Sequence, residues 1–214
     1  MNVQSFYPTS MQRVPEGRTT LKDQFGSPYL QMDRDESEIA VQTLYPQNDF
    51  RVRGDQDSVL LDYRLGGQFD VAFQRSGQDI FVDRPGVSGD FAVRRDESSV
   101  TIDRPGPYND VLVRFGPNRI DVNTFDPTQR VSIERRGEDV FVSQGGFLAE
   151  TYPAKLFPGG WPSEPTLSSV SEYTGLDERT SESLDRWAKT GIDKDDIVRV
   201  DRQGQLYTFE SYYQ

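Results

Sequence analysis

Residues 91–102 read FAVRRDESSVTI and decide the fold, because two short alternations of apolar and polar residues flank a polar turn. Alternation with a period of two is the pattern of a strand that buries one of its faces. The string RDES occurs at residues 34–37 and again at residues 95–98, at the same place in its unit. The stretch therefore reads as one β-hairpin of a repeating array.

The same two-strand unit recurs through residues 29–146, and equivalent strands of successive units start 20 or 21 residues apart. Such a fixed period is the signature of a repeat architecture. The first strands of the six units begin at Leu30, Phe50, Val71, Phe91, Val111 and Val131, and the second strands begin at Ile39, Val59, Ile80, Val100, Ile120 and Val140.

Each strand supplies two inward positions, and most of them hold β-branched or aromatic residues, which favour strands. Outward positions are mostly polar, as at Arg94 and Thr101. The predicted core is Leu30, Met32, Ile39, Val41, Phe50, Val52, Val59, Leu61, Val71, Phe73, Ile80, Val82, Phe91, Val93, Val100, Ile102, Val111, Val113, Ile120, Val122, Val131, Ile133, Val140 and Val142.

Short and long connections alternate along the array. The long connections lie between units and carry prolines, as in Arg104-Pro105-Gly106, and no proline falls on an inward position, as sheet hydrogen bonding requires. Within a unit, the apolar pairs are symmetric about two-residue centres that we place at Ser76-Gly77, Asp96-Glu97, Gly116-Pro117 and Arg136-Gly137.

These patterns predict an all-β fold in which six 20-residue two-strand repeats form an antiparallel hairpin meander. The alternative is a β-solenoid or β-roll, in which each unit is one rung. Two-residue turns favour the meander, because facing sheets lie about 10 Å apart and need a longer link. The strict period favours the solenoid, in which equivalent residues stack from rung to rung.

The pattern weakens on both sides of the array. Residues 1–28 are predicted to be an irregular N-terminal segment, with a possible half-repeat around Thr20-Leu21. Residues 147–166 are rich in proline and glycine and are predicted to be a linker or loop. Residues 167–214 are predicted to form a small α/β segment, with a helix near residues 177–189, that packs on or caps the repeats.

The amino-acid composition excludes or disfavours several classes of function. With 35 acidic and 24 basic residues the net charge is −11, which disfavours nucleic acid and anionic membrane surfaces as partners. The chain has no Cys and no His, so thiolate chemistry, disulfides and imidazole-based proton transfer are excluded. No catalytic or cofactor motif is present, so we assign no catalytic residue and no cofactor site and favour a protein without enzymatic activity.

The N-terminal residues hold no apolar stretch of signal-peptide length, and no apolar run approaches 18 residues. We therefore expect no membrane insertion. The protein is expected to be cytoplasmic, or exported without a cleaved N-terminal signal.

Carboxylates flank two of the long connections. Asp83 and Asp90 flank residues 84–89, and Asp103 and Asp110 flank residues 104–109. In a meander these pairs face each other, and like charges opposed across a sheet are unfavourable. Neighbouring arginines, water or a hard cation with oxygen ligands must relieve them. The four aspartates are therefore candidate calcium ligands.

Two stretches, Ser76-Gly77-Gln78-Asp79-Ile80-Phe81-Val82 and Gly89-Asp90-Phe91, resemble the calcium-binding nonapeptide repeats of type-I-secreted toxins and proteases. The resemblance implies a β-roll, bound calcium and secretion. The chain departs from that pattern in two ways, because strand starts alternate between 9 and 11 residues apart and the paired glycines are missing.

Three functional hypotheses follow. The first is a non-enzymatic structural or protein-interaction repeat protein, in the setting of a secreted or delivered bacterial or phage factor. It would present an extended charged surface to a protein partner, or self-associate through its β-sheet. The second is a carbohydrate-binding or carbohydrate-active protein, which requires Trp161 or Trp187 in a groove with two carboxylates. The third is a calcium-stabilised β-roll.

Overall fold

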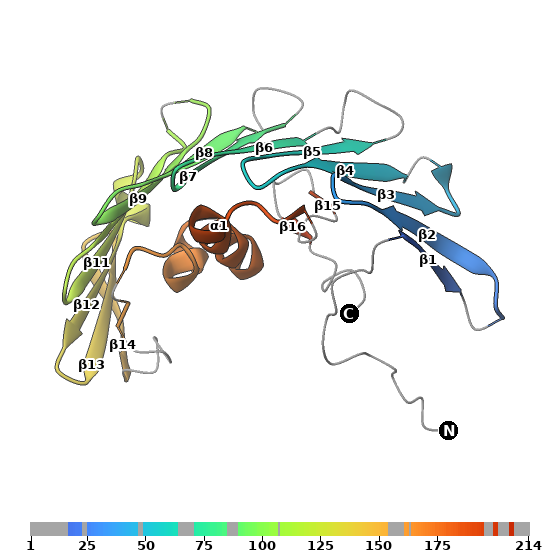
Figure 1. Ribbon diagram of the computed structural model, residues 1–214. Helices are drawn as coiled ribbons and strands as arrows, with labels where there is room; N and C mark the ends of the chain where they lie inside the picture. Colours follow the sequence, from blue (N-terminus) through green and yellow to red (C-terminus); the bar gives the residue numbers. More distant parts are fainter. Residues whose placement is uncertain are drawn as a thin grey trace, which may run out of the picture.

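The computed structural model describes residues 17–207 apart from residues 23–24, 47–48, 64–70, 85–89, 107, 154–160, 163, 195–198 and 201–205. In this part of the chain, fourteen strands form one open antiparallel sheet in chain order, and the sheet curves into an arch (Figure 1). The predicted hairpin meander is confirmed. The solenoid alternative is wrong, because the units share a single sheet instead of facing each other across two.

The strands of the large sheet are β1 (Gly17–Lys22), β2 (Pro28–Arg34), β3 (Glu38–Thr43), β4 (Phe50–Gly54), β5 (Ser58–Tyr63), β6 (Val71–Ser76), β7 (Asp79–Asp83), β8 (Phe91–Arg95), β9 (Ser99–Asp103), β10 (Val111–Phe115), β11 (Arg119–Thr124), β12 (Val131–Arg136), β13 (Asp139–Gln144) and β14 (Phe147–Pro153). A one-turn 3-10 helix, η2 (Pro127–Gln129), lies in the connection between β11 and β12.

The core lies on the concave face of the arch and consists of the predicted inward side chains. All of them are buried except Phe50, which is partly buried and packs against the others. Because side chains alternate between the two faces of a strand, one run of apolar residues at every second position is enough to build this face. The predicted core is confirmed.

The short turns lie one residue further along the chain than predicted. Ser76 pairs with Asp79, so the turn between them is Gly77-Gln78. Glycine stands first in this turn with φ of 63°, and Gly137 does so in the turn after β12 with φ of 66°. Glycine at this position is the requirement of a type II′ turn. A one-residue shift of the centre moves the register by two, so every side chain keeps its predicted face.

The sheet is longer than the predicted array by one strand at each end. Residues 17–22 form β1 and residues 147–153 form β14, where an irregular segment and a linker were expected. The alternation is weak there for a physical reason. The register shifts between Leu21 and Lys22 against β2, and between Val142 and Ser143 against β14, and such bulges break the period of two.

The C-terminal strap, which we define as residues 161–194 without residue 163, packs on the concave face. It contains the 3-10 helix η4 (Ser168–Tyr173) and the helix α1 (Glu178–Thr190), and Figure 1 shows α1 inside the arch. Asp177 caps α1 by accepting a hydrogen bond from the Thr180 amide at 2.6 Å. Trp187 is fully buried, with its ring 5.5 Å from that of Phe73 in an edge-to-face arrangement.

The strap meets the short turns of the array in reverse order. From its start to its end, it makes hydrogen bonds from Trp161 Nε1 to Gly116 O, from Arg95 Nη2 to Asp185 Oδ1, from Arg75 Nη2 to Ala188 O, from Ile192 N to Gln56 O, and from Lys194 Nζ to Asp35 O and Glu36 O. At Gly191 a Cβ would lie 2.7 Å from Gln56 Cβ, so glycine permits this close approach. The strap thus ties five successive short turns together.

A final hairpin was expected near the C-terminus as part of the α/β segment. The strands β15 (Arg199–Val200) and β16 (Leu206–Tyr207) pair antiparallel, and the turn between them lies outside the described residues.

Candidate functional site

The connections between strands gather at two opposite edges of the sheet. The short-turn edge holds residues 35–37, 55–57, 77–78, 96–98, 116–118 and 137–138. The long-turn edge holds the connections that follow β1, β3, β5, β7, β9, β11 and β13. The predicted calcium ligands belong to the long-turn edge.

Two of the four predicted ligands cap their own turns. Asp90 Oδ1 accepts a hydrogen bond from the Arg84 amide at 2.8 Å, and Asp110 Oδ1 accepts one from the Arg104 amide at 2.9 Å. Asp49 Oδ1 takes the same role for the Thr43 amide at 2.7 Å. Sequence reasoning missed Asp49, although the repeat period would have found it, because it precedes the first strand of its unit as Asp90 and Asp110 do. These carboxylates satisfy backbone donors where the ladder ends.

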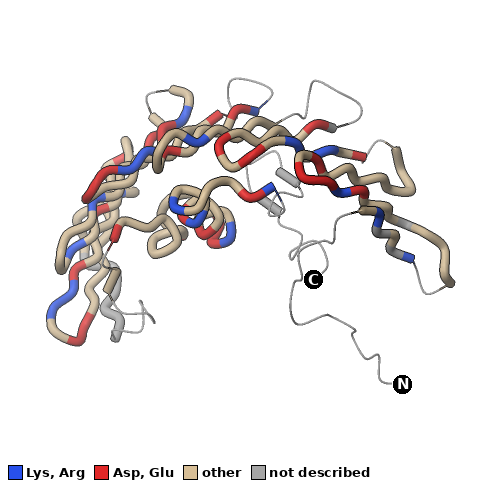
Figure 2. Tube along the Cα trace, in the orientation of Figure 1, with Lys and Arg blue, Asp and Glu red and all other residues tan. Residues whose placement is uncertain are grey.

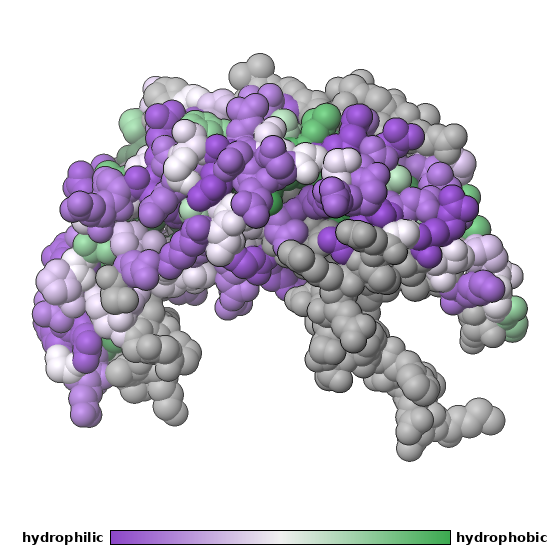
Figure 3. All heavy atoms as spheres, viewed as in Figure 1, coloured by the Kyte–Doolittle hydropathy of each residue, from purple (hydrophilic) through white to green (hydrophobic). Residues whose placement is uncertain are grey.

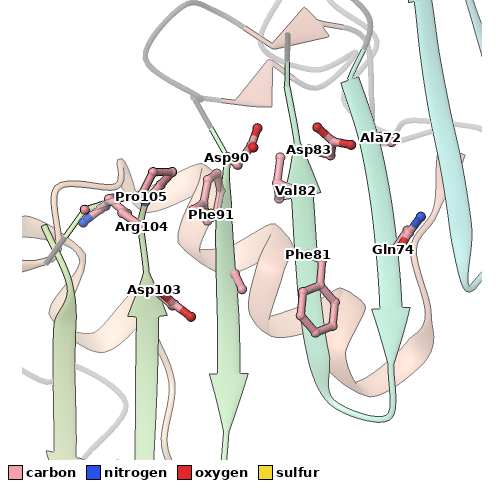
Figure 4. Close-up of a pocket in the computed structure, with 12 residues that line it drawn as sticks. Ala72, Gln74, Phe81, Val82, Asp83, Asp90, Phe91, Asp103, Arg104 and Pro105 are labelled. Atoms are coloured by element: carbon pink, nitrogen blue, oxygen red, sulfur yellow. The ribbon is translucent and has the colours of Figure 1, made fainter. Parts of the chain in front are cut away.

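The structure brings three of the four predicted ligands to one hollow. Asp83, Asp90 and Asp103 line a pocket of about 460 Å³ on the convex face, opposite α1, with alanines in its floor and Phe81 beside them (Figure 4). Asp110 is not part of it. Figure 4 shows Asp83 and Asp90 at one end of the hollow and Asp103 apart from them.

The three carboxylates differ in their partners. Asp103 forms an ion pair with Arg94 Nη2 at 3.2 Å, and Asp90 accepts the hydrogen bond from the Arg84 amide of its own turn. Asp83 is exposed and has no side-chain partner among the described residues. Within those residues, no group of three acidic side chains is arranged to hold a metal ion. Calcium binding at these four positions stays a prediction.

A second set of aspartates holds the short turns. Asp96 Oδ1 accepts hydrogen bonds from the Ser98 amide at 2.8 Å and from the Ser99 amide at 2.7 Å. Asp35 and Asp55 do the same for the amides two and three residues after them. These amide donors stabilise the ionised carboxylates and lower the pKa of all three aspartates below its ordinary value.

One buried ion pair joins the strap to the short-turn edge. The side chains of Arg95 and Asp185 are only 5% and 12% exposed, and Nη2 and Oδ1 are 2.9 Å apart. Asp185 also accepts hydrogen bonds from the amides of Leu167 and Ser168. Burial lowers the pKa of Arg95, against the opposing attraction of Asp185. The pair therefore fixes both ends of the strap's helical part on β8.

Sequence reasoning missed this pair, although a signal for half of it exists. The inward position after the two apolar ones in a first strand holds arginine in four units, at Arg34, Arg75, Arg95 and Arg135. A charged residue on an apolar face needs a partner. The pattern indicates that something polar covers this edge, but it does not identify Asp185.

Large exposed hydrophobic side chains gather on the other edge. Among the described residues they are Phe25, Leu44, Tyr45, Leu60, Tyr108, Phe125 and Phe147, and all but Leu60 lie at the long-turn edge. Sequence reasoning missed them because all lie outside the alternation that marks the core. Five fall in connections, Phe147 directly follows one, and Leu60 is an outward residue of β5.

Three of these side chains are here named the aromatic rim. Tyr108 and Phe125 lie on consecutive connections, and Phe147 is the first residue of β14, directly after the next connection. They are 64%, 58% and 80% exposed. The rings of Tyr108 and Phe125 contact edge to face, with centroids 4.3 Å apart and planes at 69°. The next connection joins them through a hydrogen bond of 2.9 Å from the Gly145 amide to Arg130 O. Tyr108 and Phe125 therefore form one contiguous aromatic pair, and Phe147 lies further along the same edge of the sheet.

The convex face carries both signs of charge, in pairs across neighbouring strands (Figure 2). Arg18 pairs with Asp33 at 2.7 Å, and Arg53 pairs with Asp62 at 2.6 Å. In the view of Figure 3 the surface is mainly hydrophilic, with hydrophobic residues scattered over it. The strands therefore do not present a surface of one sign, although the chain as a whole is strongly acidic.

The tryptophans do not form the groove that a carbohydrate site was expected to need. Trp187 is buried against Phe73, and Trp161 is half-buried with its Nε1 donating to Gly116 O at 3.2 Å. Both side chains join the strap to the array.

No family model, curated protein or solved structure matches this chain. None of the helices in the described part of the chain is long and apolar enough to span a membrane.

Proposed function

We propose that this chain is a non-enzymatic repeat protein that binds a protein partner through the aromatic rim. The observation that carries the proposal is the gathering of exposed Phe and Tyr side chains at one edge of the sheet. Aromatic residues are enriched in protein interfaces, and contiguous apolar surface on a soluble chain marks interaction sites. The arch then serves as a scaffold that holds the long connections side by side.

The polar groups around the aromatic rim support this choice, because their hydrogen bonds are made within the chain. Arg104 donates to Asn109 O at 3.2 Å and to Thr174 O at 3.0 Å. Arg130 donates to Thr124 O at 3.1 Å, and Asp126 accepts from the Thr128 amide at 2.9 Å. A sugar needs polar groups that converge on its hydroxyls, so the rim favours apolar side chains of a protein over carbohydrate.

Self-association through the sheet edges fits less well. Among the described pairings, only the two outermost, β1 with β2 and β13 with β14, contain a register irregularity. Bulges in outer strands are a device by which sheets avoid pairing with another copy. We therefore place the partner on the aromatic rim and not on an edge strand.

Site-specific photo-crosslinking tests the proposal. A benzophenone amino acid replaces Phe125 on the rim and, as matched control, Phe141 on β13, which packs under Arg136 at 4.8 Å. We expect a discrete protein adduct from position 125 and none from position 141. The purified partner should then bind Phe125→Ser about tenfold more weakly than the unmodified chain. Adducts from both positions, adducts from neither, or equal affinity for the variant would contradict the proposal.

A further inference from the structure

The hollow on the convex face and the aromatic rim are linked by one connection. Arg104, Pro105 and Gly106 line the hollow, and Tyr108 follows them in the same turn. Asn109 Nδ2 donates to Pro105 O at 3.1 Å and holds this turn together. An acidic recess and an apolar ridge therefore border one another at a single place on the molecule.

Asp83 gives the hollow a charge available to a ligand. Of the three carboxylates in the hollow, it is the one that makes neither a hydrogen bond nor an ion pair within the described part of the chain. Phe81, two residues before Asp83 on β7, lines the other end of the hollow (Figure 4), and the guanidinium of Arg94 lies 5.9 Å from the centre of its ring. A hollow that holds both a carboxylate and an aromatic ring is suited to a cationic side chain.

The volume and the chain's charge agree with such a ligand. About 460 Å³ accommodates a long side chain together with part of its backbone. The net charge of −11 attracts a basic partner at long range. The guanidinium of Arg104, at the border of the hollow, is directed to the carbonyl oxygens of Asn109 and Thr174.

We infer that the partner docks a basic segment here, with a Lys or Arg side chain in the hollow beside Asp83 and a neighbouring apolar side chain on the Tyr108–Phe125 pair. The inference rests on the proposed function and specifies the chemistry of the partner. The apolar contact supplies most of the affinity, and the charge contact supplies selection for a basic sequence.

A displayed library of random linear peptides, selected on the full chain, tests this inference. We expect the enriched peptides to combine a basic residue with a bulky apolar residue a few positions away. Synthetic copies should bind Asp83→Asn and Tyr108→Ser about tenfold more weakly than the unmodified chain, and high salt should weaken the basic contact. The control Asp139→Asn, an exposed carboxylate on the short-turn edge, should bind as the unmodified chain does.

The outcomes separate the inference from the proposed function. Peptides that lose affinity in Tyr108→Ser but not in Asp83→Asn, or that are acidic or uncharged, overturn the basic segment and leave the rim as the binding surface. Peptides that bind both variants as well as the unmodified chain count against the rim itself. If no peptide is enriched, the inference is also overturned, because it states that the partner docks a linear segment.

Discussion

The two edges of the sheet are built from the same 20-residue unit, yet they differ in what covers them. At the short-turn edge the strap contacts five successive turns and buries an ion pair against β8. At the long-turn edge the aromatic rings are more than half exposed. The C-terminal strap of the same chain therefore covers the short turns, whereas the long-turn edge leaves large apolar side chains exposed.

The largest expected effect comes from two adjacent arginines on β8. Arg95→Ala leaves Asp185 buried without its cation, so we expect a loss of about 3–5 kcal/mol in the free energy of unfolding. Arg94→Ala removes an exposed pair with Asp103 and the contact of the guanidinium with the Phe81 ring, and should cost about 0–1 kcal/mol. Urea denaturation of both variants measures the contrast. Equal losses in the free energy of unfolding would show that the buried ion pair of the strap contributes no more to stability than the exposed ion pair on the convex face.

Removing a turn cap should have a smaller effect. Asp49 is buried, and Asp49→Ala leaves the Thr43 amide without its acceptor, so we expect a loss of about 1–3 kcal/mol. Asp49→Asn keeps an acceptor oxygen in place and should recover most of this loss. If both variants unfold like the unmodified chain, the aspartates of the long turns do not hold the sheet ends.

Acid should weaken the short-turn edge in a definite direction. The pKa values of Asp35, Asp55 and Asp96 are lower in the folded chain than in the unfolded chain, because backbone amides donate to them. Their contribution is present above about pH 4, the ordinary aspartate pKa, and is lost as pH falls through the lower folded values. Urea midpoints measured over decreasing pH should therefore fall. Replacement of all three by Asn should flatten this dependence, and a midpoint that rises in acid would contradict the assignment.

The smallest expected effect concerns calcium. Asp90 and Asp110 are engaged with turn amides, and Asp103 is engaged with Arg94. We therefore expect calcium to leave the thermal unfolding midpoint unchanged. A clear rise with calcium that is absent with magnesium, and is lost in Asp83→Asn, would contradict this expectation and establish a calcium site at this edge.

Most of the fold could be predicted from the sequence, because each inward residue of the array repeats at a fixed spacing. Leu61, Val93 and Ile120 are buried where the alternation places them. The first strand is indicated only by the half-repeat around Thr20-Leu21, and the last strand lies where a linker is predicted, because bulges interrupt the alternation at both ends. The predicted turn centres were wrong by one residue. A shift of two in the strand register leaves every side chain on the same face, so the apolar pattern does not distinguish the two registers. The positive φ of Gly77, which stands first in its turn, does distinguish them.

The candidate site was predictable only in part. Asp83 was expected to face Asp90, and Asp103 to face Asp110; the meander brings Asp83, Asp90 and Asp103 to one hollow but leaves Asp110 outside it. The aromatic rim was not expected, because the exposure of Tyr108 and Phe125 depends on how two neighbouring connections pack together in space. Nor does any spacing rule link Asp185 to Arg95, which are 90 residues apart.

The central claim, that the strap buries aromatic side chains of the array while the aromatic rim lies outside the core, is tested most directly by one substitution made at two places. Phe73 is fully buried against Trp187, and Phe125 is 58% exposed at the aromatic rim. Urea denaturation should show a loss of about 3–5 kcal/mol for Phe73→Ala. For Phe125→Ala the loss should stay below about 1 kcal/mol. Similar losses at both positions would mean that the rim belongs to the core, and would contradict the account.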